Sequence, residues 1–410
     1  MPPSVLLVIA ALVGLYMAWN IGANDVANAM GTSVGSKVLT LRQAVIIAGI
    51  LEFAGAVLVG GYVTDTVRKG IVDPMVFVGD PQALVCGMIA ALASAAIWLN
   101  LASYLGWPVS TTHSIVGAIA GFGIVVGGVQ AVQWGTLLQI VLSWVTSPLV
   151  GGLVAYGVYM WIRWQILGRS DPKAEAKRMK PFLSGVLFFV LSLVLLCKGL
   201  KNLKLNLGYW QTGGLSVGFG LLGILIGRIV WNKKEEREAE GLVGMEKIFG
   251  PLQILTAASV AFAHGANDVA NAVGPMAAVF ATIRTGEVLQ KVDVPLWILL
   301  AGGAGIVFGL ATYGYRVMAT IGTKITEVTP SRGFSAEFGA SITILVGSKL
   351  GMPLSTTHTL VGAVIGVGFG RGIRALNMVV VRNILVSWIL TIPLAAGMCV
   401  FLFYLLRWLC

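Results

Sequence analysis

Apolar stretches of about twenty residues recur from one end of this chain to the other, and each is long enough to cross a bilayer as a helix. The short segments of alternating apolar and polar residues that mark transmembrane β-strands do not occur. The pattern predicts five spans in each half of the chain and two between the halves. Their expected limits are residues 4–29, 41–63, 82–104, 113–130 and 134–162, then 182–197 and 213–231, then 248–278, 295–318, 336–350, 358–370 and 379–407. The expected fold class is an all-α polytopic membrane protein with about 12 transmembrane helices.

The composition agrees with a membrane location. Of the 410 residues, 57% are hydrophobic and only 11% are charged, and the mean hydropathy is +0.88. The 53 glycines suit close packing of helices in lipid. The net charge of +11 comes from basic residues gathered in particular loops, which indicates membrane topology rather than nucleic-acid binding. We therefore expect a multi-pass protein of the cell (cytoplasmic) membrane, in contact with lipid and with no nucleic-acid partner.

The charge of the loops predicts the orientation of the spans. Residues 163–180 carry six basic side chains against two acidic ones, so this segment is expected in the cytoplasm. Counting spans from there places the N-terminus and the C-terminus outside and makes the two halves begin on opposite sides of the membrane. We expect a first transmembrane repeat at residues 1–162, cytoplasmic loops and two central helices at 163–247, and a second, inverted repeat at 248–410.

The sequence GANDVANA occurs twice inside apolar stretches, at residues 22–29 and 265–272. Polar and ionisable groups are costly within a membrane and are usually functional there. Carboxylate and amide oxygens are hard ligands that suit an alkali cation, and the glycine that opens each copy permits a local helix break. The alternative is a stripe of small residues that packs helices together. The predicted cation ligands are Asn24, Asp25 and Asn28 in the first copy, and Asn267, Asp268 and Asn271 in the second.

A second motif, P-[VL]-STTH, begins at Pro108 and again at Pro353. The two motifs recur at spacings of 243 residues (Gly22 to Gly265) and 245 residues (Pro108 to Pro353), so whole halves are duplicated. Serine is a preferred helix N-cap, which predicts helices that begin at Ser110 and Ser355 and direct free N–H groups at a small anion. In a membrane such broken helices occur only where they line a cavity. The predicted anion ligands are Ser110, Thr111, Thr112, Ser355, Thr356 and Thr357.

All three histidines of the chain, His113, His264 and His358, lie in or beside these motifs. No cluster of further histidines or cysteines accompanies them, so a zinc-type site is not indicated. We interpret them as supporting residues that hold the hydroxyl-bearing turns, with proton exchange as the alternative. Glu52 lies within a predicted span and is either a further cation ligand or a hydrogen-bonded structural carboxyl group.

These two duplicated motifs closely resemble those of the inorganic phosphate transporter (PiT) family of sodium- or proton-coupled symporters. The resemblance spans nearly the whole chain except the central insert. It implies inverted repeats with re-entrant segments, phosphate bound by the six serine and threonine residues of the second motif, and coupling cations bound by the asparagine and aspartate residues of the first. Members of the family suggest a homodimer. The extended central loop of long members is absent here, so its regulatory roles are not transferred.

The expected function is secondary active symport of inorganic phosphate with sodium ions, or with protons as the alternative, by alternating access and without an organic cofactor. Sulfate or another oxyanion is the alternative substrate. Phosphate keeps a proton to donate near neutral pH and sulfate does not, so a buried acceptor such as Asp25 or Asp268 would favour phosphate. An anion channel is the alternative mechanism, and a receptor that senses phosphate without moving it is a further one. An enzyme is not expected, because no metal-ligand cluster or paired nucleophile and base is evident.

Overall fold

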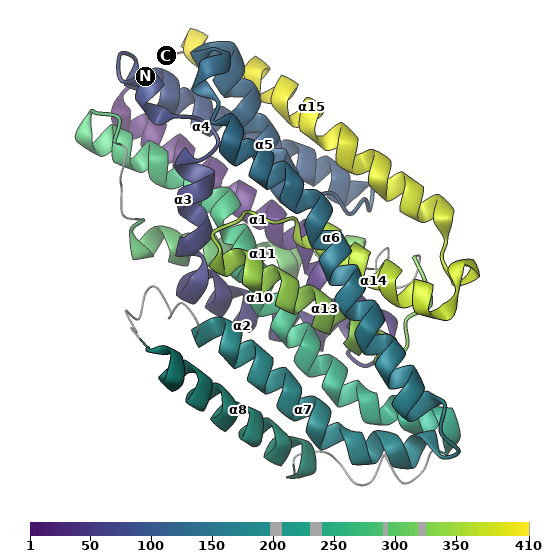
Figure 1. Cartoon of the computed structure of the whole chain (residues 1–410). Helices are drawn as coiled ribbons and strands as arrows, with labels where there is room; N and C mark the ends of the chain where they lie inside the picture. Colours follow the sequence, from purple (N-terminus) through teal and green to yellow (C-terminus); the bar gives the residue numbers. More distant parts are fainter. Residues whose placement is uncertain (197–206, 230–239, 290–293, 319–324, 410) are drawn as a thin grey trace.

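The computed structural model describes residues 1–196, 207–229, 240–289, 294–318 and 325–409. These ranges are almost entirely helical, and the one strand-like pairing within them is an isolated bridge between Val72 and Val132. Figure 1 shows that most of the long helices run side by side, with the two chain termini near each other at one end of the molecule. The expected helical membrane fold is therefore confirmed.

Along the chain, the helices are grouped here as a first half, an insert and a second half. The first half contains α1 (Pro3–Gly35), α2 (Leu41–Val59), α3 (Gly61–Lys69), α4 (Pro81–Tyr104), α5 (Thr111–Phe122) and α6 (Trp134–Ile162). The insert contains α7 (Pro172–Leu196) and α8 (Tyr209–Ile229). The second half contains α10 (Gly241–Thr285), α11 (Leu296–Tyr313), α13 (Pro330–Lys349), α14 (Thr356–Arg371) and α15 (Met378–Leu409). Short 3-10 turns occupy Pro74–Phe77, Val129–Ala131 and Ile373–Ala375, and π-helical turns occupy Gly123–Gly127 and Arg163–Leu167.

Each predicted span except 41–63 falls on one of these helices, but the limits differ. Nine helices in the described part of the chain are long and apolar enough to cross a membrane. The helix α10 has 45 residues, which is roughly 67 Å at 1.5 Å per residue, so it extends well beyond the span predicted at 248–278. The predicted span 41–63 is divided at Gly60 between α2 and α3. Residue 197 and residues 230–231, at the ends of two predicted spans, lie outside the described residues.

Two pairs of predicted spans form re-entrant hairpins rather than separate crossings. The arms α4 and α5 pack together, as do α13 and α14. The part of each turn that leads into the second arm, residues 108–110 and 353–355, is buried, whereas Leu105 and Leu350 at the other end of the turns are exposed. The outer ends of the second hairpin meet, because Arg371 lies 3.2 Å from Glu327 and the hydroxyl of Thr326 donates to the carbonyl of Ala375. Hydropathy marks an apolar helix but does not show whether the chain continues to the far side or turns back. A hairpin returns to its starting side, so the expected topology of the remaining spans is unchanged.

The two halves exchange packing partners. The return arm α5 packs on α15 of the second half, and α14 packs on α6 of the first half. Glycines four residues apart allow both contacts, Gly117 and Gly121 in α5 and Gly362 and Gly366 in α14. A Cβ atom at Gly366 would lie 2.1 Å from the backbone oxygen of Gly152, so only glycine allows the two backbones to come this close. The exchange makes the halves one interlocked structure.

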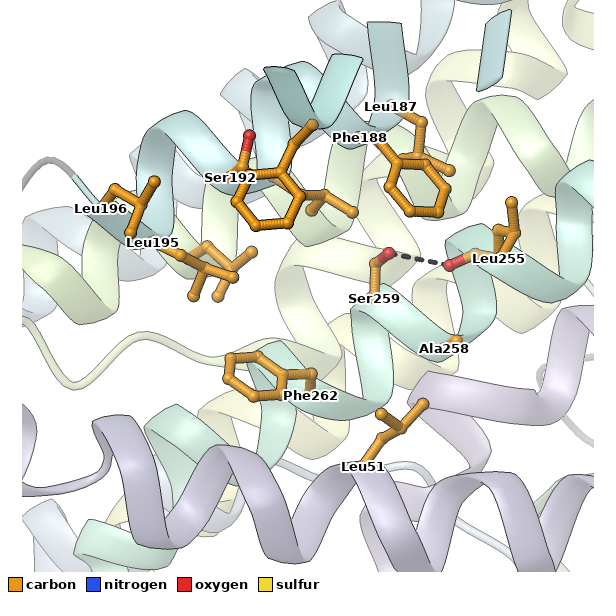
Figure 2. A pocket seen from close by; sticks show the side chains of 13 residues that line it. Leu51, Leu187, Phe188, Ser192, Leu195, Leu196, Leu255, Ala258, Ser259 and Phe262 are labelled. Atoms are coloured by element: carbon orange, nitrogen blue, oxygen red, sulfur yellow. Dashed lines mark hydrogen bonds between the residues drawn. The ribbon is translucent and has the colours of Figure 1, made fainter. Parts of the chain in front are cut away.

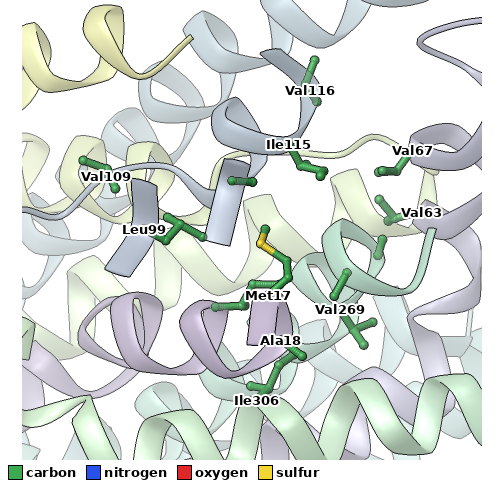
Figure 3. Close-up of a cluster of buried hydrophobic side chains, with 14 of the residues drawn as sticks. Met17, Ala18, Val63, Val67, Leu99, Val109, Ile115, Val116, Val269 and Ile306 are labelled. Carbon is green, nitrogen blue, oxygen red and sulfur yellow. The ribbon is translucent and has the colours of Figure 1, made fainter. Parts of the chain in front are cut away.

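Buried apolar residues of both halves form one hydrophobic core beside the hairpin tips. Figure 3 shows side chains from both halves packed in one cluster. The labelled residues are Met17 and Ala18 of α1, Val63 and Val67 of α3, Leu99 of α4, Val109, Ile115 and Val116 of α5, Val269 of α10 and Ile306 of α11. Val109 belongs to the turn just before α5. Because this cluster packs against the hairpin tips, it restricts the movement of the polar side chains there.

The insert packs on the outside of this structure. The helix α7 packs against α10 and α13. Along part of its length, an apolar cavity of about 430 Å³ lies between α7, α2 and α10. Figure 2 shows this cavity, lined by leucine and phenylalanine side chains. Its two serines donate their hydroxyl hydrogens to backbone carbonyls of their own helices, Ser192 to Phe189 and Ser259 to Leu255. The cavity offers no charge or free donor to an anion, so it is not a phosphate site.

Candidate anion and cation site

Two helices begin at the buried hairpin tips, where the sequence predicts helix starts. Ser110 and Ser355 are the N-caps of α5 and α14, and their hydroxyl oxygens accept hydrogen bonds from the backbone N–H groups of His113 (3.1 Å) and His358 (3.2 Å). The predicted helix starts are confirmed. The remaining N–H groups of each first turn have no acceptor within the helix, and the helix dipole adds partial positive charge there. Both tips therefore suit an anion.

The two tips contact each other through mirror-related hydrogen bonds. Thr112 donates its hydroxyl hydrogen to the carbonyl oxygen of Leu354 at 2.9 Å. Thr357 makes the equivalent contact with the carbonyl oxygen of Val109 at 3.3 Å. Both threonines are buried. These contacts bring the N-terminal ends of α5 and α14, which belong to different halves, to one place in the protein.

The first GANDVANA copy, on α1, meets the tip of the second hairpin. The amide nitrogen of Asn28 donates to Asp25 Oδ1 at 3.0 Å and to the hydroxyl of Thr357 at 2.8 Å. The same hydroxyl lies 3.3 Å from Asp25 Oδ1. A carboxylate, an amide and a hydroxyl from opposite halves thus form one buried cluster.

The second copy, on α10, makes the corresponding contacts with both tips. The amide nitrogen of Asn271 lies 3.2 Å from the hydroxyl of Thr112 and 3.4 Å from that of Thr111. Thr356 donates its hydroxyl hydrogen to Asp268 Oδ2 at 2.7 Å. The two motifs of each half therefore converge with those of the other half on a single site.

His264 joins the carboxyl groups of this site. Its Nε2 atom lies 3.0 Å from Asp268 Oδ2 and 3.7 Å from Asp25 Oδ2, and its Nδ1 atom lies 3.2 Å from Glu52 Oε1. All four side chains are fully buried. Suitable atoms of Asp25, His264 and Asp268 lie within 4.8 Å of one another, a spacing that can hold a metal ion. The predicted supporting residues His264 and Glu52 are thus in direct contact with the site.

This histidine and glutamate break the symmetry of the repeats. Gly265 packs against the backbone oxygen of Glu52, and Gly22 packs in the same way against that of Ile306. Ile306 therefore occupies the position in the second half that Glu52 has in the first. Ile21 likewise precedes Gly22 where His264 precedes Gly265. Two buried isoleucines on one side of the site thus replace the polar pair on the other, so the two sides of the site are chemically unequal.

Asn24 and Asn267 face the hairpin turns rather than the carboxylates. The amide nitrogen of Asn24 donates to the hydroxyl of Ser103 at 2.9 Å and to the carbonyl of Trp107 at 3.2 Å. Asn267 makes the mirror-related contacts, with Ser348 at 3.0 Å and the carbonyl oxygen of residue 352 at 3.1 Å. These two asparagines therefore tie α1 and α10 to the turns that carry the Ser-Thr-Thr segments.

The local helix break that Gly22 and Gly265 could permit does not occur. Both α1 and α10 continue through these positions without interruption. A Cβ atom at Gly22 would lie 1.9 Å from the oxygen of Ile306, and one at Gly265 would lie 2.0 Å from the oxygen of Glu52. These glycines are needed because another helix crosses at backbone distance, and the sequence alone does not separate that role from a break.

His113 and His358 lie on the other side of the hairpin tips and contact each other. Their ring centroids are 4.2 Å apart, and each ring packs against a tryptophan, His113 against Trp144 and His358 against Trp388. The first-turn positions of these histidines agree with the interpretation that they support the hydroxyl-bearing turns.

Glu337 of α13, which belongs to neither duplicated motif, is also fully buried. Its Oε1 atom accepts hydrogen bonds from Thr32, from Ser33 at 2.8 Å and from Gln253 at 3.2 Å, and its Oε2 atom accepts one from Thr256 at 2.6 Å. This carboxyl group thus joins α1, α10 and α13. An acidic residue within the predicted span 336–350 was the signal that could have indicated it.

The site provides ligands for an anion and for cations together. Hydroxyl groups and helix N-termini suit an oxyanion. Oxygen atoms without a hydrogen-bond partner among the described residues are the ligands that alkali cations prefer. These atoms include Asp25 Oδ2, Asn28 Oδ1, Asp268 Oδ1 and Asn271 Oδ1, and also Asn24 Oδ1 and Asn267 Oδ1 of the same motifs. Because unpaired buried oxygens are costly, the residues present fit bound cations as well as a bound anion.

Comparison with known proteins gives concordant results. A sequence profile described as "Phosphate transporter family" matches residues 21–399. A Pyrococcus furiosus protein named "Putative phosphate permease" is 49% identical over 392 residues, which is 96% of this chain and 94% of that protein. A Haemophilus influenzae protein of the same name is 44% identical over 97% of this chain and 96% of its own length. A solved structure described as "The sodium-dependent phosphate transporter" superposes with a TM-score of 0.91 at 42% identity, covering 99% of this chain and 100% of that one.

Proposed function

Because this chain belongs to the phosphate transporter family, we propose that it carries inorganic phosphate across the cell membrane together with sodium ions, by alternating access. The observation that carries the proposal is the convergence of two helix N-termini and two buried aspartates, one of each from either half, at one buried site. Positive helix ends attract the anion, and the aspartates attract the cations. A complex of nearly balanced charge costs least to move across the bilayer.

In this proposal the phosphate oxygens contact the hydroxyl-bearing tips of α5 and α14. The hydroxyls of Thr111 and Thr356 lie beside the GANDVANA side chains, so they would face both the anion and the cation ligands. Ser110 and Ser355 would bind phosphate at the N-cap positions of the two helices. Thr112 and Thr357, whose hydroxyls join the two tips, would be the remaining phosphate ligands. The support is the mirror-related geometry of two motifs that the chain carries twice.

Phosphate is favoured over sulfate by the buried carboxyl groups. Asp25 Oδ2 and Asp268 Oδ1 have no hydrogen-bond partner among the described residues, so each can accept a proton that phosphate still carries. Sulfate offers no such proton and would leave the acceptor unpaired against a negative oxygen. We expect sulfate to compete poorly with phosphate for uptake.

Sodium is favoured as the coupling ion by the ligand set. Carboxylate and amide oxygens from Asp25, Asn28, Asp268 and Asn271 are hard anionic and neutral donors. The similar solved structure, 42% identical, is described as that of a sodium-dependent phosphate transporter. Each half supplies one pair of an aspartate and an asparagine, and the presence of two pairs supports more than one sodium ion per phosphate.

The burial of the site and the packing of the helices support alternating access. The ligands are at most a few per cent exposed, so the site must open for the ions to enter or leave. The acidic ligands lie on α1 and α10, which pack against α11 and α2, whereas the hydroxyl ligands lie on α5 and α14, which pack against α15 and α6. We propose that these two groups of helices move against each other. Residues 1–162 and 248–410 would supply the inverted repeats, 163–247 the cytoplasmic loops and central helices, and both termini would lie outside.

Uptake into proteoliposomes tests this function. At fixed pH, an inward sodium gradient is expected to drive labelled phosphate well above its external concentration, and excess sulfate is expected to leave this accumulation nearly unchanged. A proton gradient without sodium separates the two coupling ions, because it drives no accumulation if sodium is required. Phosphate that equilibrates but never accumulates would identify a channel. Binding without any uptake would identify a receptor.

A further inference from the structure

We propose that His113 and His358, together with Trp144 and Trp388, are positioning residues that hold the two hydroxyl-bearing helix starts at a fixed spacing. This inference rests on the proposed function, in which phosphate binds between the same two helix starts. None of the four side chains contacts the GANDVANA residues in the described structure. Their role is therefore to act on the anion through the helices that carry them.

The four side chains form one continuous row of contacting rings, termed the ring stack, in which the two histidine rings meet edge-on and only His358 and Trp388 lie nearly parallel. The centroid of His113 lies 3.7 Å from that of Trp144 and 4.2 Å from that of His358. The centroid of His358 lies 3.4 Å from that of Trp388, with the two planes nearly parallel at 21°. Each ring is buried. Aromatic pairs at these distances add stability beyond that of area burial, so the stack resists separation of its members.

Reciprocal contacts with backbone carbonyls join the stack across the two halves. The Nδ1 atom of His113 lies 3.5 Å from the carbonyl oxygen of Trp388, and Nδ1 of His358 lies 3.2 Å from that of Trp144. A carbonyl oxygen only accepts hydrogen bonds, so both contacts assign the hydrogen to Nδ1. Two imidazolium ions with centroids this close would repel strongly in a buried site. Both rings are therefore neutral Nδ1–H donors in this proposal.

Each histidine thereby connects three helices from two halves. His113 belongs to α5, stacks on α6 of its own half and contacts the backbone of α15 in the other half. His358 belongs to α14, stacks on α15 and contacts the backbone of α6. The same helix pairs, α5 with α15 and α14 with α6, are those packed through closely spaced glycines. The four helices therefore behave as one rigid body.

The stack lies directly behind the ligands that it positions. Each histidine is the third residue of its helix and donates its backbone N–H to the N-cap serine, Ser110 or Ser355. A shift of either ring along its partner would move the N-cap and the neighbouring threonines. With the stack intact, the tips of α5 and α14 keep their spacing while α1 and α10 move relative to them.

Substitution by asparagine or glutamine separates this role from a role for Nε2. The side-chain nitrogen of asparagine can take the place of Nδ1, whereas that of glutamine takes the place of Nε2. Nε2 of both histidines has no hydrogen-bond partner among the described residues, so proton exchange at that atom is the competing role. The double variant His113→Asn/His358→Asn keeps both hydrogen bonds but loses the ring contacts, so it is expected to bind phosphate about threefold more weakly than wild type. The double variant His113→Gln/His358→Gln is expected to bind about tenfold more weakly, because two hydrogen bonds are lost.

Equilibrium binding of labelled phosphate to the purified full-length protein in saturating sodium is the measurement, because it requires no transport. Equal Kd values for wild type and both double variants would overturn the inference, and so would weaker binding in the asparagine variant than in the glutamine variant. If the glutamine pair does not fold, the single variants His113→Gln and His358→Gln are expected to weaken binding about threefold each. Wild type that binds phosphate but does not accumulate it contradicts the proposed function and leaves this inference intact. Wild type that binds no phosphate contradicts both.

Discussion

Replacing Asp25 or Asp268 by asparagine is expected to reduce sodium-driven phosphate accumulation at least about 100-fold, because each change removes one partner from a buried charged site. Asparagine has nearly the shape of aspartate, so the packing of α1 and α10 should persist. The negative charge that attracts sodium is lost, while the positive helix ends remain. The measurement is uptake into proteoliposomes at several sodium concentrations, after equal insertion of the variants has been verified.

Asp80→Asn is the matched control for this prediction. Asp80 also pairs with a cationic side chain, Arg407 at 2.8 Å, but this ion pair lies at the outer end of the first hairpin and is partly exposed. Exposed ion pairs contribute little to stability, so uptake is expected to stay within about twofold of wild type. Full sodium-dependent uptake in both Asp25→Asn and Asp268→Asn would exclude these residues as cation ligands.

Replacing Thr111 or Thr356 by valine is expected to raise the KM for phosphate about tenfold, because a hydroxyl that contacts the anion is lost at nearly constant volume. The apparent affinity for sodium should change less, since the aspartates are retained. The serine variants Thr111→Ser and Thr356→Ser keep the hydroxyl and are expected to remain near wild type. Initial rates over a range of phosphate concentrations measure this difference. A serine variant as impaired as its valine counterpart would show that the methyl group, not the hydroxyl, is required.

The duplicated motifs allowed much of this site to be predicted. Serine after proline and before two threonines is a local N-cap signal, and Ser110 and Ser355 are indeed the N-caps of buried helices. The repetition of GANDVANA in apolar sequence indicated that Asp25 and Asp268 would be buried, and both are. These predictions succeeded because they depend on short-range chemistry that a motif carries within itself.

The contacts between halves could not be predicted in the same way. Asn28 and Thr357 are 329 residues apart in the sequence. No local pattern indicates that the first copy of one motif meets the second copy of the other. The different orientation of Asn24, which holds the turn at Ser103, also depends on that packing. Adjacent residues of one motif thus face different neighbours, because successive side chains of a helix are about 100° apart.

The re-entrant hairpins were expected only from the family resemblance, and the contact within the symmetry-breaking pair was missed. Hydropathy treats an apolar helix alike whether the chain continues or turns back, so α4 and α5 were counted as separate spans. Glu52 was identified as a buried acid, but its partner His264 lies on another helix, and only the fold shows that Ile306 takes the position equivalent to that of Glu52. Glu337 was overlooked because its four donors come from α1 and α10.

The central claim is that one oxyanion binds between the N-terminal ends of α5 and α14. Arsenate resembles phosphate in shape and charge and scatters X-rays anomalously, so an anomalous difference map from crystals grown with sodium and arsenate locates it directly. We predict a single peak between Ser110 and Ser355, within hydrogen-bond distance of the Thr111 and Thr356 hydroxyls. A peak elsewhere in the protein, with none between these two helix ends, would contradict the account.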